Sequence, residues 1–359
     1  MYKQNLRKIF ILFSVLSISL YALYLRLINL VQHEFWADEY YQLNQMSGTF
    51  VDLLKSLPRN EFCSYLSGDY YLVYPFFKIF SFNKWGLAIP HIMFTILGFY
   101  ILYLICKQYF KTVWGYLITF VVVCFNATLI HHATEIRTYA VLPTLALAAF
   151  YLAQLLLDSN FQVSVIRKIW IGIFFVMLIL FHAYGIIIFF CTLIFALFDR
   201  KDGKSIKPLL GNLFKFMLIV LGVAMPLWLY SVFGPHLSTH LFKLNPSEYI
   251  PSFFTKPIGF LKCVFGNLIG FKTLYFLLPG VLFPFVLPLR DRFRLIFFLI
   301  IIVIIPITLL YISNVIGEYW FIQRQFIWVM PLFAFFLGWC WDATFIYAQA
   351  KVKNFKRLK

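Results

Sequence analysis

Long apolar runs separated by short polar segments dominate the chain. A helix needs about 17–25 mainly apolar residues to cross the hydrocarbon of a bilayer. Eight runs meet this requirement, and each predicts a transmembrane helix: 9–31, 86–106, 113–130, 139–157, 209–232, 272–289, 295–313 and 325–347. The pattern therefore predicts an all-α polytopic membrane protein.

The apolar run 169–198 is too long for one upright helix and short for two. Arg167 and Lys168 precede it, and Arg200 and Lys201 follow it. Because basic residues stay on the cytoplasmic side, both ends of this run are expected there, so the chain must turn back. We predict two short helices that meet at a tip near 182–185, with a re-entrant hairpin as the alternative. The total is then about ten transmembrane helices.

Positive charge is concentrated in six short segments. They hold 19 of the 31 Lys and Arg residues: 1–8, 107–112, 158–168, 199–208, 290–294 and 348–359. Four other segments, 111 residues against 52 in the first six, together hold nine: 32–85, 131–137, 233–271 and 314–324. The positive-inside rule places both termini, including the basic tail 348–359, in the cytoplasm. The net charge of +17 thus reflects membrane orientation and anionic lipid, and it does not call for a nucleic-acid partner.

Composition supports the membrane assignment. Hydrophobic residues make up 62% of the chain and charged residues 13%, against about 25% charged in soluble domains. The sequence has no glycine-rich phosphate loop and no Cys-x-x-Cys pair, which argues against a soluble nucleotide site or a zinc site. Residues 1–347 are expected to form one membrane domain, with an uncleaved first helix. Cys63 and Cys263 lie in long loops, where they can pair or remain free thiols.

The two long exterior segments are the places where chemistry is expected. Within 32–85, the stretches 49–57 and 70–82 fit helices that lie in the membrane interface. The segment 233–271 contains four prolines and is a candidate acceptor region. Nine of the fourteen acidic residues are expected outside, and none lies in mid-span. Because ion carriers place charges along their pathway, this distribution weakens a transporter interpretation.

Two polar clusters flank the exterior ends of predicted helices. The first contains Asp38 and Glu39, whose adjacent side chains cannot share one helical face. One of them can cap or anchor a helix while the other points into a cavity. The second runs from His131 to Tyr139, and its spacing suits a divalent metal, a polar helix start, or an arginine oriented toward phosphate. Arg324, before the last helix, is either a lipid anchor or a further cation of a site.

These motifs, taken in order, resemble the GT-C glycosyltransferases that use polyprenyl-phosphate sugars. This superfamily includes the protein O-mannosyltransferases, the bacterial aminoarabinose transferases and the smaller lipopolysaccharide-modifying transferases. Trp36-Ala37-Asp38-Glu39 reproduces the tryptophan and Asp-Glu pair that follow the first helix of the family. The segment 69–74 aligns with an Asp/His-Pro-Pro-Leu-Tyr-Tyr motif in which both prolines are replaced by tyrosine here.

Further matches follow in family order. Lys78 corresponds to a frequent basic position, and 87–90 to the Arg-Leu-Pro start of the second span. The segment 134–139, with Glu135, Arg137 and Tyr139, matches a Gln-Glu-Ala-Arg-x-Tyr box. The tip at 181–185 matches a Thr-His-Tyr-like motif, and 324–331 matches the Arg-Tyr start of the last helix.

The resemblance implies a GT-C-like bundle that moves a sugar from a polyprenyl-phosphate donor to a glycan, lipid or protein acceptor. It implies an inverting transfer on the exterior face of a bacterial inner membrane. Asp38 is then the general base, accompanied by Glu39, and the donor phosphate is bound by Arg137, Arg324 and Lys78. The competing interpretations are a transporter or lipid flippase without covalent chemistry, and a noncatalytic scaffold.

The same resemblance assigns supporting roles to four further side chains: Glu135, Tyr139, Asp69 and His182. No cofactor follows from the sequence. A divalent metal held by Asp38, His131 and Glu135 is an open alternative.

Overall fold

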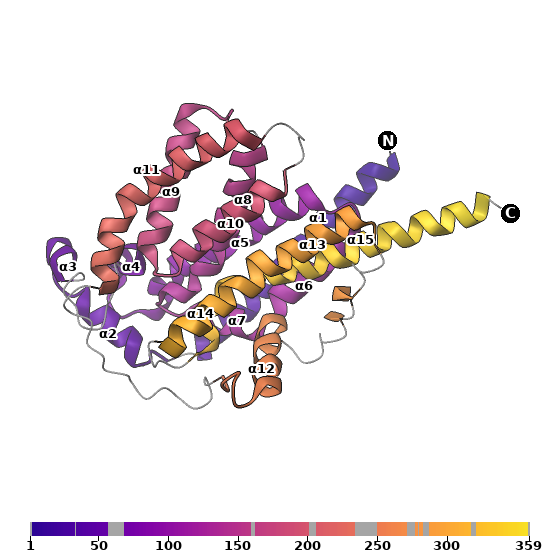
Figure 1. Ribbon diagram of the computed structural model, residues 1–359. Helices are drawn as coiled ribbons and strands as arrows, with labels where there is room; N and C mark the ends of the chain where they lie inside the picture. The colour runs from indigo at the N-terminus through magenta and orange to yellow at the C-terminus, as the bar shows by residue number, and fades with distance from the viewer. Residues whose placement is uncertain are drawn as a thin grey trace. The chain divides into compact units, whose positions relative to one another are not determined.

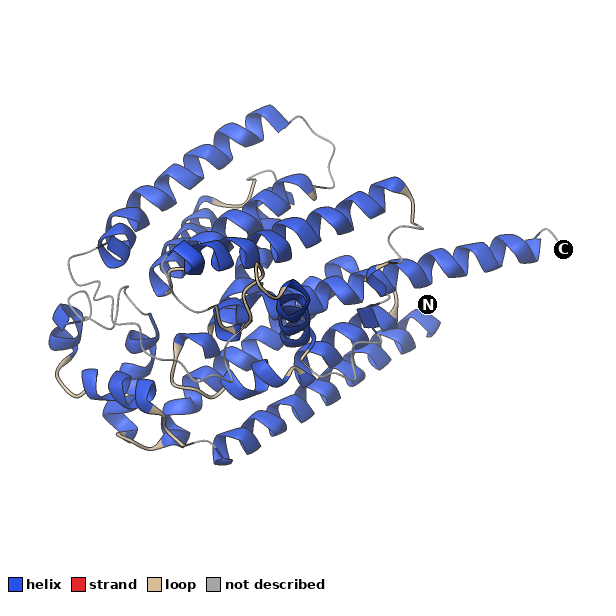
Figure 2. Ribbon diagram, turned by 60° about the horizontal axis from the view of Figure 1, so that its bottom comes forward, coloured by secondary structure: helices blue, strands red, loops and turns tan. Residues whose placement is uncertain are grey.

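The computed structural model describes most of the 359-residue chain: residues 2–32, 34–56, 68–158, 162–200, 206–233, 250–270, 277–278, 280–282, 287–316 and 321–357. Within these residues the structure is helical and contains no β-strand (Figure 2). The prediction of an all-α protein is confirmed.

The helices occur in two compact units, each built from separate parts of the chain. Unit 1 comprises 1–31, 95–134 and 244–359, and unit 2 comprises 32–94 and 135–243. The helix α5 (Lys84–Tyr109) contributes to both. The remaining helices of unit 1 are α1 (Tyr2–Gln32), α6 (Val113–Phe125), α7 (Ala127–His132), α12 (Pro257–Ile269), α13 (Leu289–Phe298), η6 (Leu299–Ile304), α14 (Ile305–Ile316), η7 (Gln323–Val329) and α15 (Met330–Arg357). Those of unit 2 are α2 (Ala37–Gln45), α3 (Phe50–Ser56), α4 (Gly68–Phe80), η2 (Thr138–Ala140), α8 (Leu142–Asp158), α9 (Val165–Phe181), α10 (Gly185–Phe198) and α11 (Ile206–Phe233).

Five helices are long and apolar enough to cross a membrane: Asn5–Gln32, Lys84–Tyr109, Leu209–Leu229, Asp291–Ile316 and Gln323–Val352. Four shorter apolar helices accompany them: Val113–Phe125, Leu142–Asp158, Gly185–Phe198 and Pro257–Ile269. The protein is thus a polytopic helical bundle, as expected. Most of the expected span 272–289 lies outside the described residues, so a total of about ten crossings stays a prediction.

Unit 1 is organised around α15, which lies along α6 (Figure 1). The two helices approach closely at Gly338, because a Cβ added there would lie 2.0 Å from Thr119 Oγ1. Small residues permit such close approach where lipid provides no hydrophobic drive between helices. Asp342 of α15 accepts hydrogen bonds from the backbone N–H groups of Lys111 and Thr112, at 2.9 and 2.6 Å, and so fastens α15 to the chain just before α6.

The run 113–130, expected as one helix, is two helices in the structure. The break falls at Asn126, whose Oδ1 accepts a hydrogen bond from Leu129 N at 2.9 Å and caps α7. Its Nδ2 donates to the carbonyl of Asn267 at 2.8 Å, near the end of α12. An asparagine side chain competes well for backbone groups, which is why it favours helix ends over helix interiors.

Unit 2 consists of four longer helices that pack in sequence, α11, α9, α10 and α8, and a cluster of short helices. The helix α9 packs beside α11 and α10, and α10 packs beside α8 (Figure 1). The run 169–198 is therefore two helices joined at 182–184, as its basic flanks predict. The short helices α2, α3 and α4 come from the segment 32–85, and α4 packs on α9. Both stretches expected to be helical in this segment are helices, and their place in a membrane interface stays a prediction.

A buried apolar cluster holds the short helices of unit 2 together. Its members come from α2, α3, α4, α5 and the loop before η2: Leu43, Met46, Leu53, Tyr70, Val73, Phe77, Leu87 and Ile136. Each of these side chains is at most 7% exposed. The cluster gives the polar groups described below a fixed support, because close-packed interiors resist displacement.

The tight turn between α9 and α10 requires glycine. A Cβ added to Gly185 would lie 2.0 Å from the carbonyl oxygen of Leu178 and 2.8 Å from the Cα of Ile179. We expect Gly185→Ala to lower the stability by about 1–3 kcal/mol, because backbone atoms must move. The melting temperature in detergent measures this. Gly211→Ala in α11 is the control, since a Cβ there meets nothing within 4 Å. Equal melting temperatures for the two variants would contradict the close turn.

Candidate active site

The helix α2 begins with a side chain that binds its own N-terminus. Trp36 precedes the helix in an extended conformation, and its backbone N–H donates to Glu39 Oε2 at 3.2 Å. Glu39 thus satisfies one of the backbone donors that a helix start leaves without an intrahelical partner. Negative side chains in the first turn, here Asp38 and Glu39, also interact favourably with the helix dipole.

The second oxygen of Glu39 binds a different part of unit 2. Glu39 Oε1 accepts a hydrogen bond from Ile136 N at 2.7 Å, and the Glu39 side chain is fully buried. Both carboxylate oxygens are therefore engaged with backbone N–H groups. Glu39 joins the start of α2 to the loop that carries Arg137, and it is placed to hold this geometry rather than to receive a proton from a substrate.

Asp38 points to a different side, as expected for the neighbour of a capping residue. Its Oδ2 lies 3.6 Å from Arg137 Nη2, and Arg137 Nη1 donates to the Asp38 carbonyl oxygen at 3.4 Å. The side chain of Asp38 is 40% exposed and that of Arg137 is 21% exposed. Partly exposed ion pairs contribute only about 0–1 kcal/mol to stability. Both groups are thus accessible to ligands and can exchange this contact at little cost.

His182 and Tyr139 lie beside Arg137 at the tip between α9 and α10. The rings of His182 and Tyr139 are 5.8 Å apart, and the ring of Tyr184 is 4.3 Å from His182. The N–H of Tyr184 donates to His182 Nδ1 at 3.2 Å, so the imidazole proton resides on Nε2. Burial, and secondly the charge of Arg137, lower the pKa of His182 to about 3. At neutral pH His182 is an uncharged, weakly basic ring.

Asp69 belongs to a fully buried polar group of three residues. Gln42 Nε2 donates to Asp69 Oδ2 at 2.6 Å, and His91 Nε2 lies 2.9 Å from Asp69 Oδ1. None of the three side chains is more than 1% exposed. The sequence motifs include Asp69 but neither Gln42 nor His91. The available signal was His91 itself, a polar residue in an otherwise apolar helix and next to Pro90.

Lys78 occupies a different place from Arg137. Its Nζ donates to the Ser47 carbonyl at 2.9 Å and lies 5.2 Å from the ring centre of Tyr74. The Tyr74 hydroxyl donates to the neighbouring Gly48 carbonyl at 3.2 Å. Lys78 is thus exposed and fastens α4 to the turn after α2. Its binding to a donor phosphate stays a prediction.

Arg324 lies in unit 1, within η7, and is 5% exposed. Next to it, the side chains of Gln325 and Asn314 form two mutual hydrogen bonds of 3.0 and 3.1 Å, which fasten η7 to α14. The burial of Arg324 argues against the lipid-anchor interpretation.

Of the polar residues nearby in the sequence, 317–320 lie outside the described residues, as does His33 beside the Asp38 motif. Cys63 does too, so its pairing with Cys263 stays untested.

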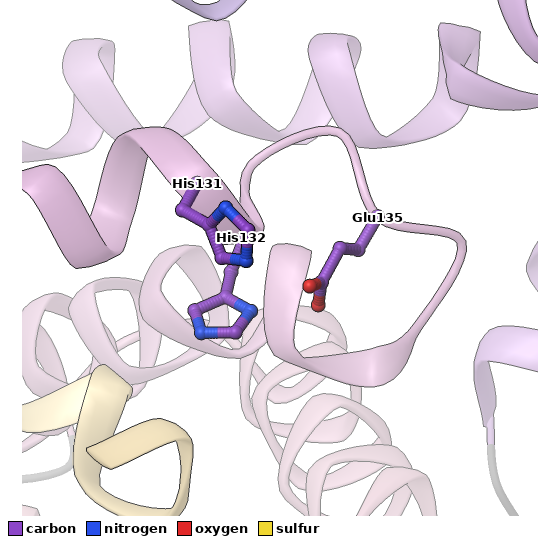
Figure 3. Close-up of side chains that lie close together, drawn as sticks. All are labelled: His131, His132 and Glu135. Atoms are coloured by element: carbon purple, nitrogen blue, oxygen red, sulfur yellow. The ribbon is translucent and has the colours of Figure 1, made fainter. Parts of the chain in front are cut away.

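His131, His132 and Glu135 form a local group in one short stretch of chain (Figure 3). Their potential ligand atoms lie within 4.8 Å of one another, and only His131 is exposed. Two imidazoles and a carboxylate suit zinc and similar divalent metals. His132 takes the position in this group that sequence analysis gave to Asp38. In the described part of the chain, Asp38 is not a member of such a group.

Comparison with known proteins gave one family match. Residues 69–230 match the family model described as dolichyl-phosphate-mannose-protein mannosyltransferase. The matched region runs from Asp69 in α4 to α11 and includes Arg137 and His182. It confirms the resemblance to GT-C glycosyltransferases, and it supports a membrane glycosyltransferase that uses a lipid-linked sugar donor. No curated protein and no solved structure matched the chain.

The neutral state of His182 predicts a specific acid sensitivity. Its folded pKa of about 3 lies below the ordinary 6.5, so the unfolded chain binds more protons between these values. The contribution of neutral His182 to the free energy of unfolding is therefore fully present above pH 6.5, and it is lost as the pH drops toward 3. Melting temperatures across this window should fall less for His182→Gln than for the unchanged protein. Parallel pH profiles for the two proteins would contradict the burial of His182.

Proposed function

We propose that this GT-C-type membrane protein is an inverting glycosyltransferase that moves a sugar from a polyprenyl phosphate to an acceptor on the exterior face. The family match supports the lipid-linked donor. One observation supports the site: Asp38, partly exposed, lies 3.6 Å from Arg137, while the buried Glu39 fastens both of their backbone segments. In a transfer that releases a phosphate, a carboxylate can accept the proton of the acceptor, and a nearby guanidinium can stabilise the charge on the leaving phosphate.

In this mechanism the acceptor hydroxyl attacks the anomeric carbon of the donor sugar. The new bond forms between the acceptor oxygen and that carbon as the bond from the carbon to the phosphate oxygen breaks. The bonding electrons leave with the polyprenyl phosphate, and the acceptor proton passes to the Asp38 carboxylate. A single displacement of this kind inverts the anomeric carbon.

The leaving phosphate gains negative charge, which Arg137 is placed to stabilise. Its guanidinium can offer two parallel N–H donors to phosphate oxygens, and such charge-assisted bonds are stronger than neutral ones. Before the donor binds, one of these nitrogens lies near Asp38 Oδ2 at 3.6 Å. The length of this contact allows the guanidinium to turn toward a phosphate. We assign Arg324 and Lys78 as further donor cations and Tyr139 and His182 as supports of Arg137.

A divalent metal fits the stretch that precedes Arg137. His131, His132 and Glu135 would hold it, and a bound metal would supply positive charge and Lewis acidity.

The acceptor is a glycan, lipid or protein, and the site faces the periplasm of a bacterial inner membrane, with both termini in the cytoplasm. The orientation follows the distribution of Lys and Arg along the chain, and the bacterial inner membrane is what the resemblance to the smaller GT-C transferases implies.

Removing the proposed base should abolish transfer. We expect Asp38→Asn to lower the rate by about 100-fold or more, since general-base catalysis contributes about 10²–10⁴-fold. The assay follows label from a polyprenyl-phosphate sugar into product in membranes that contain equal amounts of each variant. Asp52→Asn is the matched control, because Asp52 is an exposed acid of the same loop that binds Thr49 within its own turn. Activity of Asp38→Asn within tenfold of the Asp52→Asn level would reject Asp38 as the base.

Arg137 should act on the donor more than on the acceptor. Charge-assisted hydrogen bonds are worth about 1.5–3 kcal/mol, so Arg137→Gln should lower kcat/KM for the donor by about 10- to 100-fold. The acceptor KM should change little. Lys55→Gln, which removes an exposed charge from α3, should leave both constants near their original values. An Arg137→Gln enzyme that is impaired mainly in acceptor KM would contradict this assignment.

A further inference from the structure

Asp69 joins three helices of unit 2 at one buried point. Its Oδ2 accepts from Gln42 of α2 at 2.6 Å, and its Oδ1 lies 2.9 Å from His91 Nε2 of α5. Asp69 itself stands at the start of α4. Asp69 and His91 are fully buried, and Gln42 is 1% exposed. Each side chain comes from a different helix, so the contacts form only when α2, α4 and α5 take one relative orientation.

Stability alone does not require this arrangement. Well-packed apolar residues of similar volume often replace buried polar groups with no loss of stability. Here the surroundings are already apolar, with Leu43 of α2 and Met46 just after it packed with Tyr70 and Val73 of α4. A hydrogen-bonded polar group in such a core has a different effect, because its directional bonds select one geometry among several that apolar packing would accept.

The geometry selected here includes the rotation of α2 about its own axis. Asp38 and Gln42 are four residues apart on α2 and therefore lie on the same helical face. Glu39 is a further polar tether of the helix and accepts a hydrogen bond from Ile136 N. The helix has nine residues, and helices this short depend on tertiary contacts to form at all. A single tether at Glu39 fixes the position of the helix start, whereas a second tether one turn further on also fixes its rotation.

Small rotations matter at the proposed base. Side-chain tips lie about 5–6 Å from the axis of a helix, so a rotation of about 10° moves a tip by about 1 Å. A misplacement of about 1 Å can cost about 100-fold in rate. Asp38 is partly exposed, and its carboxylate lies 3.6 Å from Arg137 on a different segment of the chain. Its direction therefore depends on the orientation of the helix that carries it.

We propose that Gln42, Asp69 and His91 form a positioning group that sets the rotation of α2 and so aligns Asp38 with Arg137. None of the three touches substrate. The proposal rests on the proposed function, in which Asp38 is the base. It adds two residues, Gln42 and His91, that neither the sequence motifs nor the family match assigns.

Gln42→Met tests the proposal, because methionine fills a similar volume but cannot donate to Asp69. We expect kcat to fall about tenfold or more while the donor KM stays within about threefold, since Arg137 lies on a different segment. Gln45→Met is the matched control, with the same substitution at the end of the same helix. It should leave both constants unchanged. A loss in Gln42→Met no larger than in Gln45→Met would overturn the proposal.

A second measurement reports the geometry without any transferase activity. Asp38→Cys is made with Cys63→Ser and Cys263→Ser, because the other four cysteines are buried. Arg137 should hold the pKa of the introduced thiol below its ordinary value of about 8.5, which the pH dependence of alkylation measures. Adding Gln42→Met should move this profile toward 8.5. An unchanged profile would overturn the positioning role, whereas an active Asp38→Asn enzyme would overturn the proposed function alone.

A triple variant covers the case in which Gln42→Met destabilises the protein. Replacing Gln42, Asp69 and His91 together by leucine removes the donors and the acceptor of this group at the same time, so the fold should persist. If the group sets the rotation of α2, the folded triple variant should still show low kcat and the shifted thiol profile. A triple variant with the original kcat and profile would show that the three residues serve packing only.

Discussion

Glu39 has no exposed surface, and each of its carboxylate oxygens accepts a hydrogen bond from a backbone N–H, one at Trp36 and one at Ile136. Breaking such a buried contact leaves a charge without a partner, which is strongly unfavourable. The start of α2 and the segment before Arg137 are 97 residues apart in the sequence and are held together at this point. The neighbouring Asp38 and Arg137 inherit their proximity from Glu39, and their own weak contact follows from it.

The short helices around this contact have the same dependence on polar tethers. The helix α3 begins with Thr49 and Asp52, which exchange backbone and side-chain hydrogen bonds. The helix α4 is tied to the turn after α2 through Lys78 and Tyr74. Helices of this length gain little from intrinsic propensity. Capping bonds, together with the apolar cluster beneath, therefore account for the short helices α2, α3 and α4.

The sequence was sufficient for features that depend on local pattern. Apolar length and basic flanks predicted α9 and α10, and the turn at 182–184 lies where the tip was expected. The Asp38-Glu39 pair and the box that contains Arg137 were found as motifs, and the structure brings Asp38 and Arg137 together. The helix break at Asn126 was not predicted. Apolar residues continue on both sides of it, and a hydropathy pattern does not show which side chain will bind a backbone N–H.

Long-range polar partners were the features that the sequence could not supply. Asp69 was selected from a motif, but its partners lie 27 and 22 residues away, at Gln42 and His91, with no periodicity linking them. Such pairings depend on how three helices cross, and crossing geometry is set by packing. Lys78 was matched by its charge alone, and its Nζ donates to the Ser47 carbonyl, a contact that no local sequence pattern predicts.

Two arginines show how surroundings separate a structural role from a chemical one. Arg26 of α1 is 3% exposed, and its guanidinium donates to the carbonyls of Ala22 and Cys124 at 3.0 and 3.4 Å. Those acceptors belong to α1 itself and to the last turn of α6, where a cation is favoured by the helix dipole. Arg137 has more exposed surface, a longer contact and a carboxylate partner that is itself accessible. A buried cation whose donors bind backbone carbonyls stabilises the fold, whereas a partly exposed cation that lies beside an accessible carboxylate can also meet a ligand. This difference is why the chemistry is assigned to Arg137, although both residues carry the same charge.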